Sequence, residues 1–395
     1  METYELVLGK AQTAKKAAAK LAVTGTAVKN AALLAMAAAL EEKTEEILAA
    51  NARDMEAAQA NGMRSSMLDR LKLTTERVAG MADGLRQVAN LPDPIGNVLD
   101  GKTLPNGLQI TKVRVPLGVI GIIYEARPNV TADAAGLCLK SGNAVILKGG
   151  SEAMESNKAV AAFLAAAAEA HGIPAGAIQF VDTSDRQAVT DLIHLNGLVD
   201  VVIPRGGAGL IQAVVRNASV PVIETGAGVC HTYVDKAADV QMATKIAFNA
   251  KVQRPSVCNA METLLVHKDI ADKFLPMMLM MYNTSGVEVR GDEAVQEYSS
   301  QVHPATEEDW ATEYGDLRLS VKIVDSIEEA MEHIAKFGTG HSECIVTEDY
   351  AAAQLFQSTV DAAAVYVNAS TRFTDGNEFG FGAEIGISTQ KLHAR

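Results

Sequence analysis

The first quarter of the chain shows no strand-type alternation of apolar and polar residues. Its Ala-rich segments lie at residues 15–21, 27–51 and 67–88. Segments of this composition favour helices. Two prolines, at residues 92 and 94, close the region, because a proline cannot continue a helix. We therefore predict a helical part that covers residues 1 to about 95.

A single alternating stretch follows. Charged and apolar residues alternate from residue 107 to residue 115. This pattern predicts a half-exposed strand. An exposed strand can pair with a strand of another subunit. We expect a small oligomerisation strand at about residues 107–116.

After Pro116, short apolar runs alternate with helical patterns. The runs predict buried strands at residues 119–124, 144–147, 178–181, 200–203 and 220–223. The helical patterns between them lie at residues 131–140, 151–171, 185–195 and 209–217. A second series of strands is predicted at residues 263–266, 321–324, 342–346 and 365–368. Apolar strands that are separated by helical crossovers are typical of parallel sheets with helices on both faces. The pattern therefore predicts an α/β protein with two parallel-sheet domains, whereas the polar residues 287–318 predict no element.

Composition and charge exclude several classes of protein. Hydrophobic residues make up 48% of the 395 residues and charged residues 21%, as in ordinary globular proteins. The net charge, 35 − 48 = −13, comes without a basic stripe, which argues against nucleic acid or a membrane surface as partner. The four cysteines lie far apart and the histidines have no metal-binding spacing, so we expect no disulfide and no metal. No apolar run could span a bilayer and the acidic start does not suit a signal peptide, so a cytoplasmic location is expected.

Cys258 is the main candidate for chemistry. It lies on a connector between a helical pattern at residues 240–249 and the strand predicted at residues 263–266. A connector leaves backbone N–H groups available to a ligand, and sulfur is the best side-chain nucleophile near neutral pH. The nearby Arg254 favours the thiolate. Since a cysteine is more often a buried small hydrophobe, the residues around Cys258 must decide between the two readings.

Other candidate residues follow predicted strands. The three glycine clusters of the chain fail the G-x-G-x-x-G pattern, but Gly206 and Gly207 open a helix and could bind a phosphate with its N-terminal amides. Lys148 ends a strand beside small residues and suits an anion such as a ribose phosphate. Asn129, which follows a proline, can donate a hydrogen bond to a developing oxyanion. Glu224 ends a buried strand, where α/β proteins bind ligands, although a capping or ion-paired role fits this position equally well.

Several motifs occur in a characteristic order along the chain. They are Arg-Pro-Asn at residues 127–129, Gly-Asn-Ala-Val-Ile-Leu-Lys at 142–148, Glu-Thr-Gly at 224–226, Phe-Asn at 248–249, Cys258 and Glu-Tyr-Gly at 313–315. In this order they resemble the aldehyde dehydrogenase superfamily. Longer stretches resemble the branch of that superfamily that reduces L-glutamate 5-phosphate in proline biosynthesis. These stretches lie at residues 124–131, 147–153, 253–260, 338–343 and 386–395.

The resemblance covers nearly the whole chain and implies both a fold and a reaction. The fold would be aldehyde-dehydrogenase-like, with two parallel-sheet α/β domains and a small oligomerisation strand segment. Residues 1–225 would bind NADPH, residues 226–368 would form the catalytic domain with Cys258, and residues 369–395 would return toward the cofactor and oligomerisation region. The reaction would be the NADPH-dependent reduction of L-glutamate 5-phosphate to L-glutamate 5-semialdehyde and phosphate, through a thioacyl intermediate. The resemblance also implies a homo-oligomer and makes glutamate 5-kinase a candidate partner.

The resemblance assigns roles to individual residues. Cys258 matches the nucleophile and Asn129 the oxyanion-hole asparagine. The residues assigned to the cofactor are Lys148, Ser151, Arg205, Gly206, Gly207, Thr225, Gly226 and Glu313. Within this set, Lys148 and Ser151 match the adenosine-ribose site, and Glu313 matches the glutamate that holds the nicotinamide ribose. Ser151 replaces a carboxylate that would repel a 2′-phosphate, which favours NADPH. The residues assigned to the substrate carboxylate are Arg127, Arg254 and Arg372.

Two alternatives stay open at this point. Glu224 matches the general base of ordinary aldehyde dehydrogenases, which oxidise aldehydes with an activated water, whereas a reductase that releases phosphate needs no such base. A non-catalytic cofactor-binding or scaffolding homologue is the second alternative, and the pair Asn129 and Cys258 argues against it. The chain departs from the branch at Phe337, where His or Tyr is usual. It also stops at Arg395, where relatives usually continue, so part of a subunit-pairing tail is expected to be missing.

Overall fold

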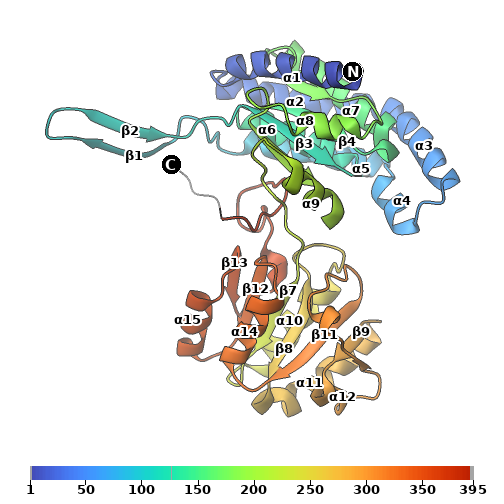
Figure 1. Cartoon of the computed structure of the whole chain (residues 1–395), viewed down its shortest axis with the longest axis vertical. Coiled ribbons are helices and arrows are strands. Elements are labelled where there is room, and N and C mark those ends of the chain that lie inside the picture. Colours follow the sequence, from blue (N-terminus) through green and yellow to red (C-terminus); the bar gives the residue numbers. More distant parts are fainter. Residues whose placement is uncertain (1, 126, 392–395) are drawn as a thin grey trace. The chain divides into compact units, whose positions relative to one another are not determined.

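The computed structural model describes residues 2–125 and 127–391 and divides the chain into two compact units (Figure 1). The first unit contains the chain up to Thr225 and the short segment Phe381–Gly386. The second unit contains Gly226–Gly380 and the described residues from Ile387 onward. The chain therefore passes three times between the units.

Helices begin the first unit, as its alanine-rich sequence predicts. They are α1 (Glu2–Leu21), α2 (Thr26–Glu42), α3 (Thr44–Ala60), α4 (Ser65–Leu71) and α5 (Thr75–Asn90). The Ala-rich segment at residues 27–51 forms two helices, which meet at Lys43. The side chain of Thr74 caps α5 by accepting a hydrogen bond from the Arg77 N–H.

An exposed antiparallel hairpin follows the helices. It consists of β1 (Val98–Thr103) and β2 (Gln109–Val113), and every residue of both strands is exposed. The strand predicted at residues 107–116 corresponds to β2. Its partner β1 was not predicted, because its sequence Val-Leu-Asp-Gly-Lys-Thr has no regular alternation. Figure 1 shows the hairpin extending away from the rest of the first unit.

The core of the first unit is a parallel sheet with the strand order β5-β4-β3-β6. Its strands are β3 (Val119–Tyr124), β4 (Ala144–Gly149), β5 (Ile178–Phe180) and β6 (Val201–Arg205). Its remaining helices are α6 (Asn129–Lys140), η1 (Ser151–Ala153), α7 (Met154–Ala170), α8 (Gln187–Leu192) and α9 (Ala208–Asn217). Alternate β3 residues face opposite sides: Ile122 packs with α2, α5, α6 and α7, and Ile123 packs with α1 and α8. Helices therefore cover both faces, as the apolar strands predicted.

The prediction of a strand at residues 220–223 is wrong. This segment makes only an isolated bridge between Val222 and Val202 of β6. The Val202 N–H donates to the carbonyl of Pro221 and the Ile223 N–H donates back to Val202. The next donors of the ladder would be the N–H groups of Pro221 in one direction and of Pro204 in the other, and proline has none, which explains why the pairing is limited to these two hydrogen bonds.

The second unit is built on a seven-stranded sheet with the order β10-β9-β11-β8-β7-β12-β13, in which every pairing is parallel. Its strands are β7 (Cys230–Val234), β8 (Met261–His267), β9 (Glu288–Gly291), β10 (His303–Pro304), β11 (Arg318–Val324), β12 (Ser342–Val346) and β13 (Ala364–Val367). The four strands predicted for this half correspond to β8, β11, β12 and β13. The sequence did not predict β7, β9 or β10, of which the last two lie in the polar residues 287–318.

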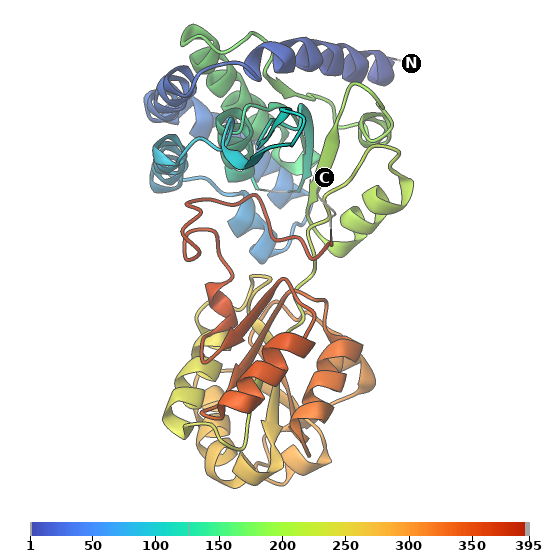
Figure 2. The same ribbon diagram turned by 90° about the vertical axis from the view of Figure 1, so that its left-hand side faces the viewer.

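Helices cover both faces of this second sheet (Figure 2). They are α10 (Val240–Val252), α11 (Lys268–Thr284), α12 (Glu293–Gln296), α13 (Glu307–Trp310), α14 (Ile327–Phe337), α15 (Tyr350–Thr359) and η2 (Thr371–Phe373). α10 and α11 pack on one face, and α14 and α15 on the other. The predicted α/β fold with two parallel sheets is thereby confirmed. Among residues 2–125 and 127–391, no helix is both long and apolar enough to cross a membrane.

Candidate active site

Cys258 lies on the connector between α10 and β8 and is partly buried. Its carbonyl oxygen accepts a hydrogen bond from the Sγ of Cys230, at 3.2 Å. The backbone also approaches closely here: a Cβ atom on Gly228 would lie 1.6 Å from the Cys258 carbonyl oxygen. Only glycine fits at position 228, so the segment before β7 holds the Cys258 backbone in place.

The neighbouring Asn259 ties this connector to the segment after β13. Its side chain accepts a hydrogen bond from Nη1 of Arg372 and donates one to the Thr374 carbonyl, at 2.9 Å. Its carbonyl accepts a hydrogen bond from the Thr371 hydroxyl, at 2.8 Å. The connector and η2 therefore form one hydrogen-bonded structure, and Arg372 contacts the residue that directly follows Cys258.

Two guanidinium groups contribute positive charge near this thiol. Burial lowers the pKa of Arg372 and the charge of Arg254 lowers it further, whereas the Cys258 sulfur acts in the opposite direction. Arg372 is therefore close enough to both Arg254 and Cys258 for their charges to interact. A cationic neighbour favours a thiolate, the nucleophilic form of cysteine. Sequence reasoning named all three residues, and the structure places them in the second unit.

Behind the connector lies a buried polar chain that sequence reasoning missed. The Sγ of Cys230 lies 3.7 Å from Nδ1 of His341, and this nitrogen lies 2.8 Å from the Ser342 hydroxyl. Ser342 continues to the Thr374 hydroxyl, at 2.7 Å. Burial raises the pKa of Cys230, so this second thiol stays protonated. The sequence signal for this series of hydrogen bonds is the Gly-His-Ser-Glu segment at residues 340–343, which entered the sequence analysis only as part of a resemblance.

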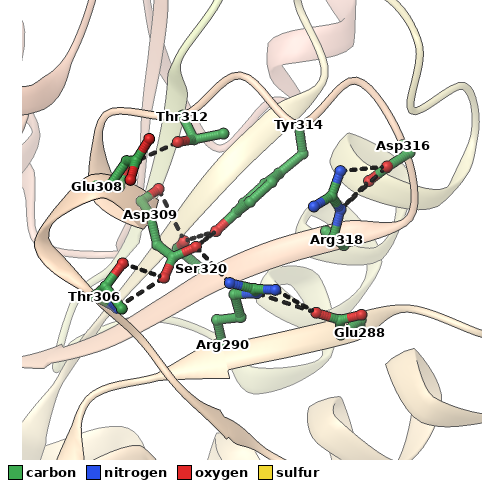
Figure 3. A network of polar contacts seen from close by, with 10 residues as sticks. All are labelled: Glu288, Arg290, Thr306, Glu308, Asp309, Thr312, Tyr314, Asp316, Arg318 and Ser320. Carbon is green, nitrogen blue, oxygen red and sulfur yellow. Dashed lines mark hydrogen bonds and ion pairs between the residues drawn. The ribbon is translucent and has the colours of Figure 1, made fainter.

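Glu313 lies on the loop between α13 and β11 and is exposed. The loop is anchored at the next two residues. The Tyr314 hydroxyl donates to Oδ1 of Asp309, at 2.8 Å (Figure 3). The Gly315 N–H donates to Oε1 of Glu262, at 3.2 Å. Burial raises the pKa of Glu262, against the attraction of the Lys251 ammonium group. The loop thus presents one carboxylate to solvent from a fixed backbone.

In the first unit, Lys148 lies at the end of β4 and is buried. Its Nζ donates to the carbonyl of Gly149, at 2.8 Å. Burial lowers the pKa of Lys148, whereas the carboxylates of Glu152 and Asp185 raise it. Ser151 opens η1 and is exposed. A buried ammonium group beside an exposed hydroxyl suits an anionic ligand group.

Arg205 ends β6, and Gly206 and Gly207 form the turn from this strand to α9. The Gly207 N–H donates to Oε2 of Glu125, at 2.8 Å. A carboxylate on this amide shows that the turn accepts an anion, as the N-terminus of a helix favours. Sequence reasoning missed Glu125, because no local pattern marks its contact with a turn so distant in the chain.

The remaining predicted cofactor residues lie where the chain passes between the units. The Thr225 hydroxyl donates to the Pro204 carbonyl, at 2.9 Å, and the Gly226 N–H donates to the Ile387 carbonyl, at 3.2 Å. Oε1 of Glu224 accepts a hydrogen bond from Gln212, at 3.3 Å. Glu224 is thus in contact with α9, the helix that follows the Gly206-Gly207 turn.

Asn129 and Arg127 belong to the first unit, whereas Cys258, Arg254 and Arg372 belong to the second. Asn129 is exposed at the start of α6. Its side-chain amide donates to Oδ2 of Asp133, one turn further along the helix, at 3.1 Å. Burial raises the pKa of Asp133 to about 6.

In the described part of the chain, no group of three or more His, Cys, Asp or Glu side chains could hold a metal ion.

Comparison with known proteins places the chain in a family. Residues 2–309 match the model of the aldehyde dehydrogenase family. A gamma-glutamyl phosphate reductase of Moorella thermoacetica is 62% identical over 98% of this chain and 92% of the relative. That of Heliobacterium modesticaldum is 60% identical over the whole chain and 95% of the relative.

Solved structures agree with these matches. The crystal structure of gamma-glutamyl phosphate reductase from Thermotoga maritima is 50% identical, has a TM-score of 0.96 and covers 98% of this chain and 94% of its own. A probable aldehyde dehydrogenase of Listeria monocytogenes, 16% identical with a TM-score of 0.70, shares the fold over 98% of this chain and 91% of its own. With parallel sheets, a half-buried connector cysteine and sequence identity along its whole length, the chain belongs to the aldehyde dehydrogenase family, in the branch of the gamma-glutamyl phosphate reductases.

Proposed function

We propose that this chain reduces L-glutamate 5-phosphate to L-glutamate 5-semialdehyde and phosphate, with NADPH as reductant and Cys258 as nucleophile. The observation that carries the proposal is the partly buried Cys258 beside Arg372, in a chain 62% identical to a gamma-glutamyl phosphate reductase. The same reaction is the second step of proline biosynthesis from glutamate. A cytoplasmic location fits a substrate that is made and consumed inside the cell.

The mechanism follows from the chemistry of an acyl phosphate. The Cys258 thiolate attacks the γ-carbonyl carbon, and the carbonyl oxygen becomes an oxyanion. The Asn129 amide and the Cys258 N–H would donate hydrogen bonds to it, each worth roughly 3 kcal/mol in the transition state. The C–O bond to phosphate then breaks and leaves a thioester on Cys258. Splitting the reduction into two steps in this way lowers the barrier of each step.

A nicotinamide cofactor, when bound, would supply a hydride to the thioester carbon, and a hemithioacetal would form on Cys258. Collapse of this species releases the aldehyde and regenerates the thiolate. The residues that would hold the cofactor are Lys148, Ser151, Arg205, Gly206, Gly207, Thr225, Gly226 and Glu313. Lys148 and Ser151 would bind the adenosine ribose, where the ammonium group favours the 2′-phosphate of NADPH over NADH. Glu313 would accept hydrogen bonds from the nicotinamide ribose.

Arginines near Cys258 would bind the two anionic groups of the substrate. Arg254 and Arg372 lie in the same unit as the nucleophile, and a guanidinium group matches a phosphate or a carboxylate in two hydrogen bonds. Arg127 is the third candidate, from the first unit. We expect Arg372→Gln or Arg254→Gln to raise KM for L-glutamate 5-phosphate by about tenfold or more, the value of a lost hydrogen bond between charged groups. If KM stays at the wild-type value in these variants and in Arg127→Gln, this assignment is wrong.

Hydrolytic aldehyde oxidation is the competing function. It needs a base that activates water, and Glu224 matches that base by resemblance. A reductase that releases phosphate needs no activated water, so Glu224→Gln should leave the phosphate-dependent reaction at its wild-type rate.

Assembly also belongs to the proposal. The β1–β2 hairpin exposes apolar side chains along its whole length, and an isolated hairpin is at best marginally stable in water. A homo-oligomer in which the hairpin pairs with a second copy would bury these apolar side chains and stabilise the hairpin. Glutamate 5-kinase is a candidate partner, because direct transfer would protect an acyl phosphate from hydrolysis.

The test is the reverse reaction: phosphate-dependent reduction of NADP⁺ by L-glutamate 5-semialdehyde. We expect activity in the wild type only when phosphate is present, and none in Cys258→Ala. NADP⁺ reduction without phosphate would instead indicate a hydrolytic dehydrogenase. A folded wild-type chain that binds NADPH without activity would indicate a non-catalytic homologue.

A further inference from the structure

A buried ion pair lies next to the connector that carries Cys258. Lys251 and Glu262 have relative side-chain exposures of 0% and 1%, and Nζ of Lys251 lies 2.6 Å from Oε2 of Glu262. Removing two charges from water costs free energy that their attraction only partly offsets, and apolar residues of similar size often stabilise a protein better. Stability alone therefore does not explain this pair, whereas a role in positioning the neighbouring segments does.

The pair joins the two ends of the connector. Lys251 belongs to the last turn of α10, and Glu262 is the second residue of β8. Residues 253–260, with Cys258 among them, run between these two elements. The short contact between Nζ and Oε2 therefore fixes where the connector begins relative to where it ends.

The same pair also contacts the loop that carries Glu313. The second carboxylate oxygen of Glu262 accepts a hydrogen bond from the Gly315 N–H, at 3.2 Å. Nζ of Lys251 lies 6.0 Å from the centroid of the Tyr314 ring, within range of a cation–π interaction. Both partners thus reach the two residues that directly follow Glu313.

A second set of contacts holds the far end of Tyr314 (Figure 3). Its hydroxyl donates to Oδ1 of Asp309, at 2.8 Å, and lies 2.9 Å from the Ser320 hydroxyl. Arg290 donates to the same Asp309 oxygen, at 3.0 Å, and the Arg318 guanidinium lies 5.0 Å from the Tyr314 ring centroid. The loop is therefore held at the Tyr314 side chain and at the Gly315 N–H, the two residues after the exposed Glu313.

We propose that Lys251 and Glu262 are positioning residues, which hold the Glu313 loop ready to bind the nicotinamide ribose and couple that loop to the Cys258 connector. The inference rests on the proposed function, in which Glu313 binds this ribose. A loop that is fixed before the ligand arrives loses less conformational entropy on binding, so the ligand binds more tightly. Without the ion pair, the Glu262 carboxylate is no longer held where it accepts the hydrogen bond from the Gly315 N–H. The Glu313 loop must then be ordered when the ligand binds, which reduces the binding free energy.

The test compares two ligands of the substrate-free protein. NADPH contains the nicotinamide ribose, whereas 2′,5′-ADP contains only the adenosine half. For Lys251→Met we expect Kd for NADPH to rise by about tenfold, the value of a hydrogen bond to a charged group, and Kd for 2′,5′-ADP to stay unchanged. Lys251→Arg, which keeps the charge, should restore most of the affinity for NADPH.

A double-mutant cycle separates positioning from a direct effect. If Lys251 acts through Glu313, then Lys251→Met has no further effect on NADPH binding in a Glu313→Ala background. Tyr314→Phe removes only a hydroxyl and leaves no buried charge unpaired, so it tests the same loop should Lys251→Met fail to fold. It should also weaken NADPH binding and spare 2′,5′-ADP.

Lys322→Met is the matched control. It breaks another ion pair of the same unit, with Glu329 at 2.8 Å, which is more exposed than the Lys251–Glu262 pair and makes no hydrogen bond to the Glu313 loop among the described residues, and it should leave both affinities unchanged. The inference is wrong if Lys251→Met and Tyr314→Phe leave NADPH binding unchanged, if they weaken both ligands equally, or if their effects add to that of Glu313→Ala. Failure of the wild type to bind either ligand would instead contradict the proposed function itself.

Discussion

Exposure distinguishes Cys258 from the other three thiols. Cys138, Cys230 and Cys344 are at most 1% exposed. Burial raises the pKa of each, to about 12 for Cys138 and for Cys344. A buried, protonated thiol is neither accessible nor nucleophilic. Cys258 alone is partly exposed, with Arg372 beside it.

Alkylation of the native protein should therefore stop after one cysteine. With iodoacetamide near neutral pH we expect a single modified residue, Cys258, identified by mass spectrometry of the digested protein. Cys258→Ala should take up no label while folded, and both proteins should label their remaining cysteines fully once denatured. Fast labelling of Cys230 in the folded Cys258→Ala variant would show that the Cys230 thiol is accessible to solvent and would contradict this prediction.

At the scale of single residues, the sequence identifies which side chains are chemically suited to the site, but not which distant residues they contact. Cys258 and Arg254 can be named from the sequence because they share one connector. The hydrogen bonds from Arg372 and Thr371 to Asn259 join residues more than a hundred positions apart, so no local pattern announces them. Glu125 was missed for the same reason, since its partner Gly207 is 82 positions away.

At the scale of elements, the β1–β2 hairpin exposes large apolar side chains, whereas those in the strands of the two sheets are buried or half-buried. Its apolar residues Leu99, Leu108 and Ile110 are 50%, 54% and 40% exposed. A free strand edge with apolar side chains is a template for pairing with another chain. The alternation at residues 107–115 predicted this strand because one residue in two is apolar, whatever covers it.

The hairpin makes the proposed oligomer testable. The wild type should have a solution mass above the 41.7 kDa of one chain, measured by light scattering after gel filtration. Leu99→Glu combined with Ile110→Glu should lower that mass, because charges at an apolar interface oppose its burial. Val23→Glu changes a residue that is 86% exposed elsewhere in the first unit and should keep the wild-type mass. A hairpin variant of unchanged mass would exclude this surface as the interface.

Among the strands, the apolar ones were predictable and the polar ones were not. β3 reads as a continuous apolar run and β8 contains the run Leu264–Val266, because both faces of a parallel sheet are buried. β7 reads Cys-His-Thr-Tyr-Val and gave no such signal. It is nevertheless buried, because its polar groups find distant partners: the N–H and Nδ1 of His231 lie 2.8 and 3.0 Å from one carboxylate oxygen of Glu343. A polar strand becomes predictable only when such partners are known.

At the scale of the whole molecule, periodicity and composition indicated two sheets but not how the chain is shared between them, and only the resemblance implied that residues 369–395 return toward the cofactor region. The segment Phe381–Gly386 returns to the first unit, where Ala383 and Ile385 pack against its core. Gly382, at φ +77°, lies where a Cβ atom would be 2.1 Å from Leu91. Such a return depends on contacts across nearly three hundred residues, which neither periodicity nor composition encodes.

This returning segment sets an order for biosynthesis. A ribosome makes the chain from the N-terminus, and domains commonly fold as they emerge. The first unit cannot be finished in that way, because its closing residues leave the ribosome only after all of Gly226–Gly380 has been made. Until then, Leu91 and the neighbouring core surface lack their contacts with the segment Phe381–Gly386. Completion of the nascent first unit is therefore delayed until the whole segment Gly226–Gly380 has been made.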